Sequence, residues 1–148
     1  MRRDQVASGK RSAGSFLPAV ARQAEWRRAM WMRFAAINGF VAVTIGMAAG
    51  QPSLDPVIAE HMRVGAQMAF MHTMATFACS TFIQVGARRA RAAPVFFLAG
   101  CAFFSGPHYL AAAGVHHALL LAPFGGASFL AGWAIIAWAA AEIDLPKS

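Results

Sequence analysis

The sequence predicts an all-α integral membrane protein, a bundle of four transmembrane helices with both termini in the cytoplasm (N-in/C-in). Residues 92–141 contain no Asp, Glu, Lys or Arg, and shorter uncharged runs precede them at 34–54 and 64–87. Because about 20 apolar residues cross the hydrocarbon core of a bilayer, the long run can cross twice and each shorter run once. A soluble domain would expose charged helix faces, which these three runs lack.

Residues 1–33 form a basic leader in which eight Arg and Lys residues face only two acidic ones. From residue 19 to 33 the leader is expected to form a short interfacial helix. In that helix Trp26 and Trp31 would lie among the headgroups and the arginines would contact anionic lipid. Translation from Met32 is an alternative that omits most of this leader.

The four spans follow in order and are separated by polar or basic turns. Their expected bounds are 34–50, 64–85, 92–113 and 118–141, and residues 142–148 form a cytoplasmic tail. Gln51, Pro52 and Ser53 end the first span as a loop. Pro107 lies inside the third span, where it should kink or locally break the helix.

The distribution of positive charge sets the expected orientation. The leader, the turn at 86–91 and the tail hold twelve of the thirteen Lys and Arg residues, and Arg63 is the remaining one. Because basic residues collect on the cytoplasmic side, both termini are predicted to face the cytoplasm of a bacterial inner membrane. The net charge of +7 then has a membrane explanation, and no basic domain for nucleic acid is present.

The second span carries a polar stripe with a spacing of four residues, which keeps the side chains on one helix face. The stripe comprises His72, Thr76, Ser80 and Gln84, and Asn38 of the first span is expected to join it. Polar groups are costly against lipid, so the stripe should face the other helices. It either forms interhelical hydrogen bonds or lines a polar pathway.

Small residues at helical spacing predict close helix packing. They are Gly46 and Gly50 in the first span, Ala102 and Gly106 in the third, and Gly132 in the fourth. Such residues let helix backbones approach closely in lipid. Four short helices in one chain need these contacts, so the pattern favours a bundle more than a dimer.

All five histidines fall toward the predicted outer half of the protein. A metal or haem site would require His72 and His108 to converge from different spans, because no two histidines lie three or four residues apart on one helix. These two are weak candidates, and no metal or cofactor is predicted. Cys79 and Cys101 are expected to be buried packing residues.

A set of motifs in the second half resembles a known family. The motif residues are Phe104, Ser105, Gly106, Tyr109, Pro123, Gly125, Gly126 and Trp133. The combination is similar to the small bacterial inner-membrane proteins of the domain of unknown function 423, also called UPF0382, over about residues 33–141. That family has no established activity, so the resemblance implies architecture and localisation. This chain differs from the family between Gly106 and Tyr109, where it has Pro107 and His108.

Within the predicted spans, the absence of Asp, Glu, Lys and Arg argues against several activities. No intramembrane carboxylate is available for proton-coupled export, and no lysine for a Schiff base. The first hypothesis is therefore a non-enzymatic accessory or assembly protein of a larger membrane complex. An oligomeric permease for a small solute or ion is the alternative, and a metal- or haem-binding membrane protein is the third.

Overall fold

The computed structural model describes the backbone of residues 19–143 and side chains from Met30 onward. The chain divides into two compact units, Met1–Met30 and Trp31–Ser148, at a boundary inside the first helix. The expected lipid contacts of Trp26 and of the leader arginines up to Arg28 lie outside the described side chains. The last five residues of the tail are also outside the described range.

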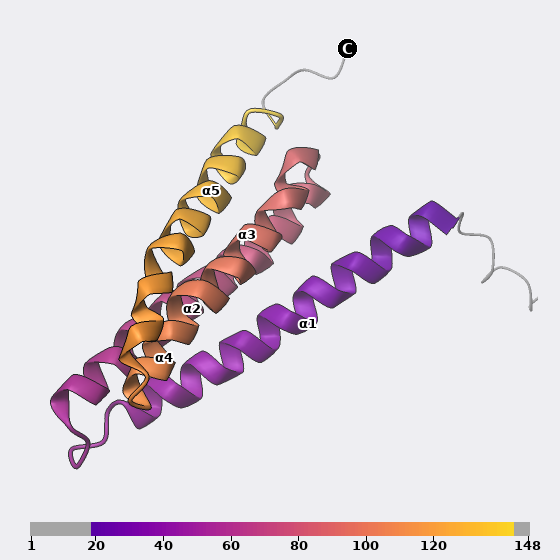
Figure 1. Ribbon diagram of the computed structural model, residues 1–148. Helices are drawn as coiled ribbons and strands as arrows, with labels where there is room; N and C mark the ends of the chain where they lie inside the picture. Colours follow the sequence, from indigo (N-terminus) through magenta and orange to yellow (C-terminus); the bar gives the residue numbers. More distant parts are fainter. Residues whose placement is uncertain (1–18, 144–148) are drawn as a thin grey trace, which may run out of the picture. The chain divides into compact units, whose positions relative to one another are not determined.

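Helices make up almost all of the described backbone, which contains no strand, so the all-α prediction is confirmed there. In chain order they are α1 (Ala19–Ala48), α2 (Pro56–Gln84), η1 (Arg88–Ala92), α3 (Ala93–Gly100), η2 (Cys101–Ser105), α4 (Gly106–Ala112), η3 (His116–Leu121) and α5 (Ala122–Ala140). The segments η1 to α4 follow one another directly, as do η3 and α5 (Figure 1). The chain thus has four long helical stretches between residues 19 and 143.

Three of these stretches are long and apolar enough to cross a membrane: Met30–Ala48, Arg88–Ala112 and His116–Ala140. They overlap the first, third and fourth expected spans. The expected second span, 64–85, corresponds to α2 up to Gln84, but α2 does not belong to this group. The polar stripe of α2 and the charged residues Glu60 and Arg63 near its start make this helix less apolar than the three candidate spans.

Helix α1 contacts α2 through small residues. Within the second unit the buried apolar residues of α1 are Ala35 and Ala42, and Ala49, directly after the helix, continues the spacing of seven positions. A Cβ atom placed on Gly46 would lie 3.6 Å from the Cβ of Ala66 in α2. Large side chains point away from this seam, and Phe40 is 75% exposed. Small residues allow two helices to approach closely, so this row of small residues is the surface of α1 that contacts α2.

The start of α2 is fixed by a side-chain cap. Asp55 accepts hydrogen bonds at Oδ1 from the backbone N–H groups of Val57 (2.9 Å) and Ile58 (3.2 Å). Pro56 occupies the first turn, where its missing N–H would have had no helical partner. The negative charge of the carboxylate also interacts favourably with the positive end of the helix dipole at the start of α2. The helix ends before Gly86, whose positive φ of 109° suits a glycine.

The expected disturbance at Pro107 takes the form of a π-helical turn. Residues Cys101–Ser105 are π-helical, and the N–H of Gly106 donates to the carbonyl of Cys101 five residues back. Proline has no N–H and its ring collides with the carbonyl four residues earlier, so a regular α-helix could not continue through it unchanged. The widened turn lets the helical stretch pass Pro107 without a break.

The contact between α5 and the third stretch is an interlock of glycines and phenylalanines. A Cβ on Gly132 would lie 2.6 Å from Cε1 of Phe97, and one on Gly100 would collide with the ring of Phe129. Phe97 and Phe129 are 0% and 3% exposed. Each phenylalanine therefore occupies the space that a glycine of the opposite helix leaves free.

Other glycines differ in their surroundings. A Cβ on Gly125 would collide with the backbone at Phe103 and Phe104, whereas one on Gly126 or Gly106 would meet nothing within 4 Å. Ala102 is exposed, so neither it nor Gly106 makes the close helix contact that its spacing suggested. A Cβ on Gly50 would lie 3.3 Å from the carbonyl oxygen of Met47, a contact within its own segment.

We predict that Gly125→Ala lowers the free energy of unfolding by about 1–3 kcal/mol, because the added methyl group strikes backbone that cannot rotate away. Gly126→Ala is the matched control and should be neutral or stabilising by up to about 1 kcal/mol, since alanine is the better helix former. Cys79 and Cys101 are buried, so a thiol-reactive dye reports thermal unfolding in detergent. Equal unfolding midpoints for the two variants would contradict the close contact of Gly125 with the backbone at Phe103 and Phe104.

Candidate functional site

His72 lies at the centre of the second unit, where α2 meets α3 and α5. Its side chain is 3% exposed. Ring nitrogen Nδ1 lies 2.8 Å from the carbonyl oxygen of Met68, one turn earlier in α2. The indole Nε1–H of Trp133 in α5 donates to Nε2 of His72 at 3.3 Å. Both ring nitrogens therefore have a protein partner.

These two contacts define the state of the imidazole. A carbonyl oxygen can only accept a hydrogen bond, so Nδ1 carries the proton. The indole N–H can only donate, so Nε2 must offer a lone pair. The contacts fit only the neutral imidazole protonated at Nδ1. His72 is thus held as a neutral, fully hydrogen-bonded group rather than as a free base or an open metal ligand.

Aromatic rings surround His72 and complete what we call the aromatic cluster. It consists of His72, Phe97, Phe104, Phe129 and Trp133. The ring of Phe129 stacks on His72 with centroids 3.5 Å apart and planes 11° apart. Phe97 lies edge-on to Trp133 at 5.4 Å, and Phe104 contacts Phe129 at 5.9 Å. The cluster joins the polar helix α2 to both apolar stretches that pack on it.

The remaining stripe residues form hydrogen bonds inside the protein. Asn38 of α1 donates through Nδ2 to Oγ1 of Thr73 at 2.6 Å and to the carbonyl oxygen of Ala69 at 3.3 Å. The hydroxyl of Thr76 donates to the carbonyl oxygen of His72, and that of Ser80 to Phe77, both in α2. The polar groups in this part of the stripe therefore form hydrogen bonds with the backbone of α2 or with Asn38.

The predicted stripe is not uniformly buried. His72 and Thr76 are buried, Ser80 is half-buried and Gln84 is exposed. Thr73, which is completely buried and receives the bond from Asn38, belongs to the contact although its position is one residue off the spacing of four. The sequence pattern finds the face of α2 but cannot show which hydroxyl meets α1.

Two motif residues carry polar atoms that lack a partner among the described residues. They are the hydroxyl oxygens of Ser105 and Tyr109, on successive turns of the third helical stretch. Tyr109 lies against Gly65 of α2, where a Cβ would come within 2.6 Å of its ring. Pro123 occupies the first turn of α5 and is exposed. Of these three motif residues, Tyr109 makes a close contact between helices, which joins α4 to α2.

His72 and His108 have separate neighbours. The ring of His108 lies 4.7 Å from Phe104 and 5.7 Å from His61, whereas His72 contacts Phe97, Phe129 and Trp133. Phe104 and Phe129 connect the two histidines as a row of rings. The structure does not bring them together as joint ligands.

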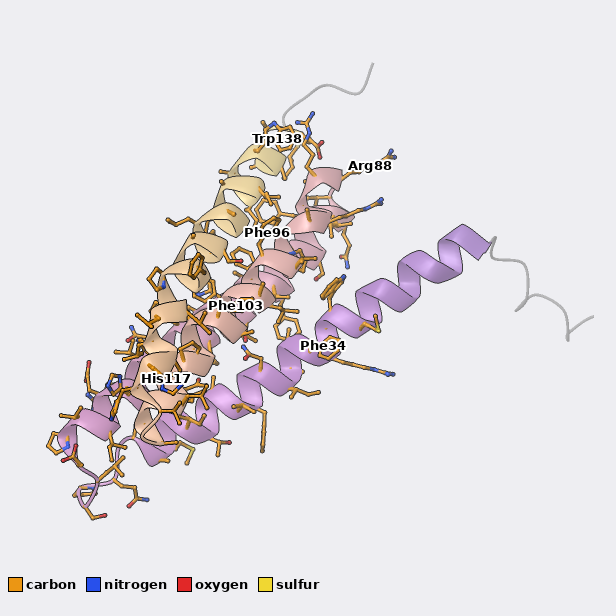
Figure 2. All side chains as sticks on the ribbon, in the orientation of Figure 1. Phe34, Arg88, Phe96, Phe103, His117 and Trp138 are labelled. Carbon is orange, nitrogen blue, oxygen red and sulfur yellow. The ribbon has the colours of Figure 1, made fainter. Side chains whose placement is uncertain are left out.

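The basic turn at 86–91 and the histidines at the start of η3 lie at opposite ends of the second unit. Figure 2 shows Arg88 and Trp138 at one end and His117 at the other. At the basic end, Nε of Arg89 pairs with Oε1 of Glu142 at 3.0 Å, and the guanidinium lies 4.2 Å from the centre of the Trp138 ring. This contact ties the turn before α3 to the end of α5.

Comparison with known proteins identifies a family. A family model described as "Protein of unknown function (DUF423)" matches residues 47–126, more than half of the chain. The matched segment contains α2, the third helical stretch and the start of α5, and Trp133 lies beyond it. No curated protein and no solved structure matches the chain.

We predict that Trp133→Phe lowers the free energy of unfolding by about 1 kcal/mol, because it removes the donor to His72 and keeps an aromatic ring. In a His72→Ala background the same change should have little further effect, since the acceptor is already gone. Trp138→Phe, which changes a ring over Arg89, is the control and should add to His72→Ala. If the effects of Trp133→Phe and His72→Ala on the free energy of unfolding are additive, the two side chains do not interact and the hydrogen bond is contradicted.

Proposed function

The chain belongs to the DUF423 family of proteins of unknown function, and we propose that it is a non-enzymatic, four-span protein of the bacterial inner membrane. In this proposal it acts as an accessory or assembly partner of a larger membrane complex. The observation that carries the proposal is the hydrogen bonding of α2. His72, Thr73 and Thr76 face inward, and their polar groups bond within the protein rather than line an open path.

The apolar outer surface supports a membrane location. Large side chains that a soluble domain would bury are exposed on α1 and α5, including Phe40 (75%), Met47 (75%) and Leu130 (73%). Helix α2 also has an apolar outer face, at Phe70, Met71 and Met74. Because its polar stripe is turned toward α1, α3 and α5, we propose that α2 crosses the bilayer as the fourth span.

Orientation follows from the charges at the two ends of the bundle. The turn with Arg88, Arg89 and Arg91 lies at one end. Asp55, just before α2, and Glu60 and Arg63, in the first turns of α2, belong to the other. The positive-inside rule assigns the first end to the cytoplasm. Both termini are then cytoplasmic, and the basic leader can bind anionic lipid.

The accessory role rests on what the exposed helix faces can bind. Among the described residues of α1, small residues and Asn38 contact α2. Large side chains such as Phe34, Ile37 and Phe40 are exposed and remain available to lipid or to a helix of a partner protein. A partner helix can replace lipid on such a face through van der Waals packing. A homo-oligomer would use the same kind of contact.

The oligomeric permease is the alternative, and the exposed Gln84 of α2 favours it. The unpartnered hydroxyls of Ser105 and Tyr109 are buried inside the chain. A path between copies of the chain would therefore be lined by Gln84 and not by these hydroxyls. Solute flux in liposomes that depends on Gln84 would support this alternative over the accessory role.

We predict that a fluorescent protein fused after Ser148 is fluorescent and that a periplasm-dependent phosphatase inserted at Ser53 is active. Ser53 lies in the turn between α1 and α2, outside both helices. The combination requires an odd number of spans between the two sites, as α2, α3–α4 and α5 provide. An active phosphatase after Ser148 would contradict the proposed topology.

We predict that the protein purified in mild detergent carries one partner protein in a constant ratio. Phe40→Ala and Leu130→Ala change two exposed faces, so loss of the partner in one variant only would locate its binding site. Unfolding midpoints equal to that of the unmodified protein would show that both variants are folded. A stable monomer with no partner, in native membranes as well as detergent, would contradict the accessory role.

A further inference from the structure

The contact between α1 and α2 leaves an open groove on the surface of the second unit. Its volume is about 380 Å³, which lies in the range of ligand sites in proteins. The groove is separate from His72 and the aromatic cluster, which lie where α2 meets α3 and α5. The residues that line it are Ala42, Val43 and Gly46 of α1 and Arg63, Ala66, Gln67 and Phe70 of α2.

The floor and the walls of the groove are apolar. Ala42 and Ala66 are buried, and a Cβ on Gly46 would lie 3.6 Å from the Cβ of Ala66, so small residues form the floor. Val43 and Phe70 stand beside this floor on opposite helices and are 48% and 44% exposed. A hydrocarbon chain that lies on the floor would contact both of these side chains. The groove therefore suits an acyl chain.

One end of the groove is polar. Arg63 and Gln67 lie on successive turns near the start of α2, and Phe70 follows them. Arg63 and Phe70 are separated by about 10 Å along the helix axis, at 1.5 Å per residue. This distance is less than the thickness of one leaflet of the hydrocarbon core, roughly 15 Å. A molecule in the groove would meet polar groups first and apolar groups deeper, which is the arrangement of a lipid in a bilayer.

The polar end offers a positive and a negative group side by side. Nη1 of Arg63 donates to Oε2 of Glu60, and both side chains are exposed. Among residues 30–143 this is the one hydrogen-bond partner of the guanidinium, which has four further N–H donors, and Oε1 of Glu60 has none. The arginine can therefore bind phosphate oxygens while the carboxylate accepts from an ammonium group. A headgroup that is only negative would be repelled by Glu60.

We propose that this groove binds one phospholipid whose headgroup carries a phosphate and a primary ammonium, a phosphatidylethanolamine. Arg63 and the amide of Gln67 donate to the phosphate and ester oxygens, and Glu60 accepts from the ammonium group. One acyl chain lies on the floor of the groove between Val43 and Phe70. The proposal rests on the membrane location proposed above, which the reporter fusions test separately.

The test uses the full-length protein in detergent, freed of lipid, titrated with phosphatidylethanolamine and followed by native mass spectrometry. Phosphatidylcholine with the same acyl chains is the control lipid. It has the same net charge, but its quaternary ammonium has no N–H to donate to Glu60. We expect phosphatidylethanolamine to bind about fivefold more tightly, as one hydrogen bond allows. Equal affinity for the two lipids would overturn the proposal.

Charge variants test the headgroup contacts. Arg63→Gln should weaken the binding of phosphatidylethanolamine about tenfold, since it removes a charge-assisted hydrogen bond. Arg91→Gln is the matched control, because it removes the same charge from an exposed arginine outside the groove and should leave the affinity unchanged. Glu60→Gln should abolish the preference over phosphatidylcholine. An equal loss of affinity in the two arginine variants would contradict the site.

A glycine variant tests the acyl-chain contact. Gly46→Leu places a side chain in the groove without striking the backbone, and should weaken binding about tenfold. Gly126→Leu is the matched control, because a Cβ there would meet nothing within 4 Å. Equal unfolding midpoints of the lipid-free proteins would show that both variants are folded, and otherwise Arg63→Gln decides. Unchanged affinity in a folded Gly46→Leu would overturn the proposal, whereas the reporter fusions could still support the membrane topology.

Discussion

The fold depends on the need of polar groups on α2 to find hydrogen bonds in an apolar environment. His72 meets this need at both ring nitrogens, one through its own helix and the other through Trp133 of α5. Thr73 meets it through Asn38 of α1. Because unsatisfied polar groups are costly away from water, each bond fixes which helix covers which side of α2.

The packing residues follow from this constraint. Trp133 reaches Nε2 of His72 only if α5 lies close to α3, and Gly132 and Gly100 make that approach possible by leaving space for Phe97 and Phe129. Phe129 then stacks on the imidazole and covers one of its faces. The glycines, the aromatic rings and the hydrogen bonds therefore support one another, so the change of any one should affect the rest.

Much of the helical architecture could be predicted from the sequence, because long uncharged runs and basic turns are local signals. The three candidate membrane spans, Met30–Ala48, Arg88–Ala112 and His116–Ala140, agree within a few residues with the first, third and fourth spans expected from the sequence. The form of the disturbance at Pro107 could not be predicted, since a kink, a break and a π turn all relieve the same clash. The sequence led us to expect a separate interfacial helix at 19–33 before the first span at 34–50. In the structure both segments belong to one helix, α1.

The candidate sites show the same division. The spacing of four identified the inward face of α2. It could not identify Trp133 as the donor to His72, because Trp133 lies 61 positions later in the chain and the contact depends on helix packing. Likewise, the sequence paired His108 with His72, whereas Gly65 brings it to His61. Side-chain spacing along one helix is encoded locally, and contacts between helices depend on which small residues permit close approach.

The most direct test of this account is nitrogen-15 NMR of the His72 side chain in the purified protein. The account predicts a neutral ring protonated at Nδ1, with Nε2 accepting a hydrogen bond from the Trp133 indole, seen as a correlation between that nitrogen and the indole proton. A ring protonated at Nε2, or an indole proton with no contact to His72, would contradict it.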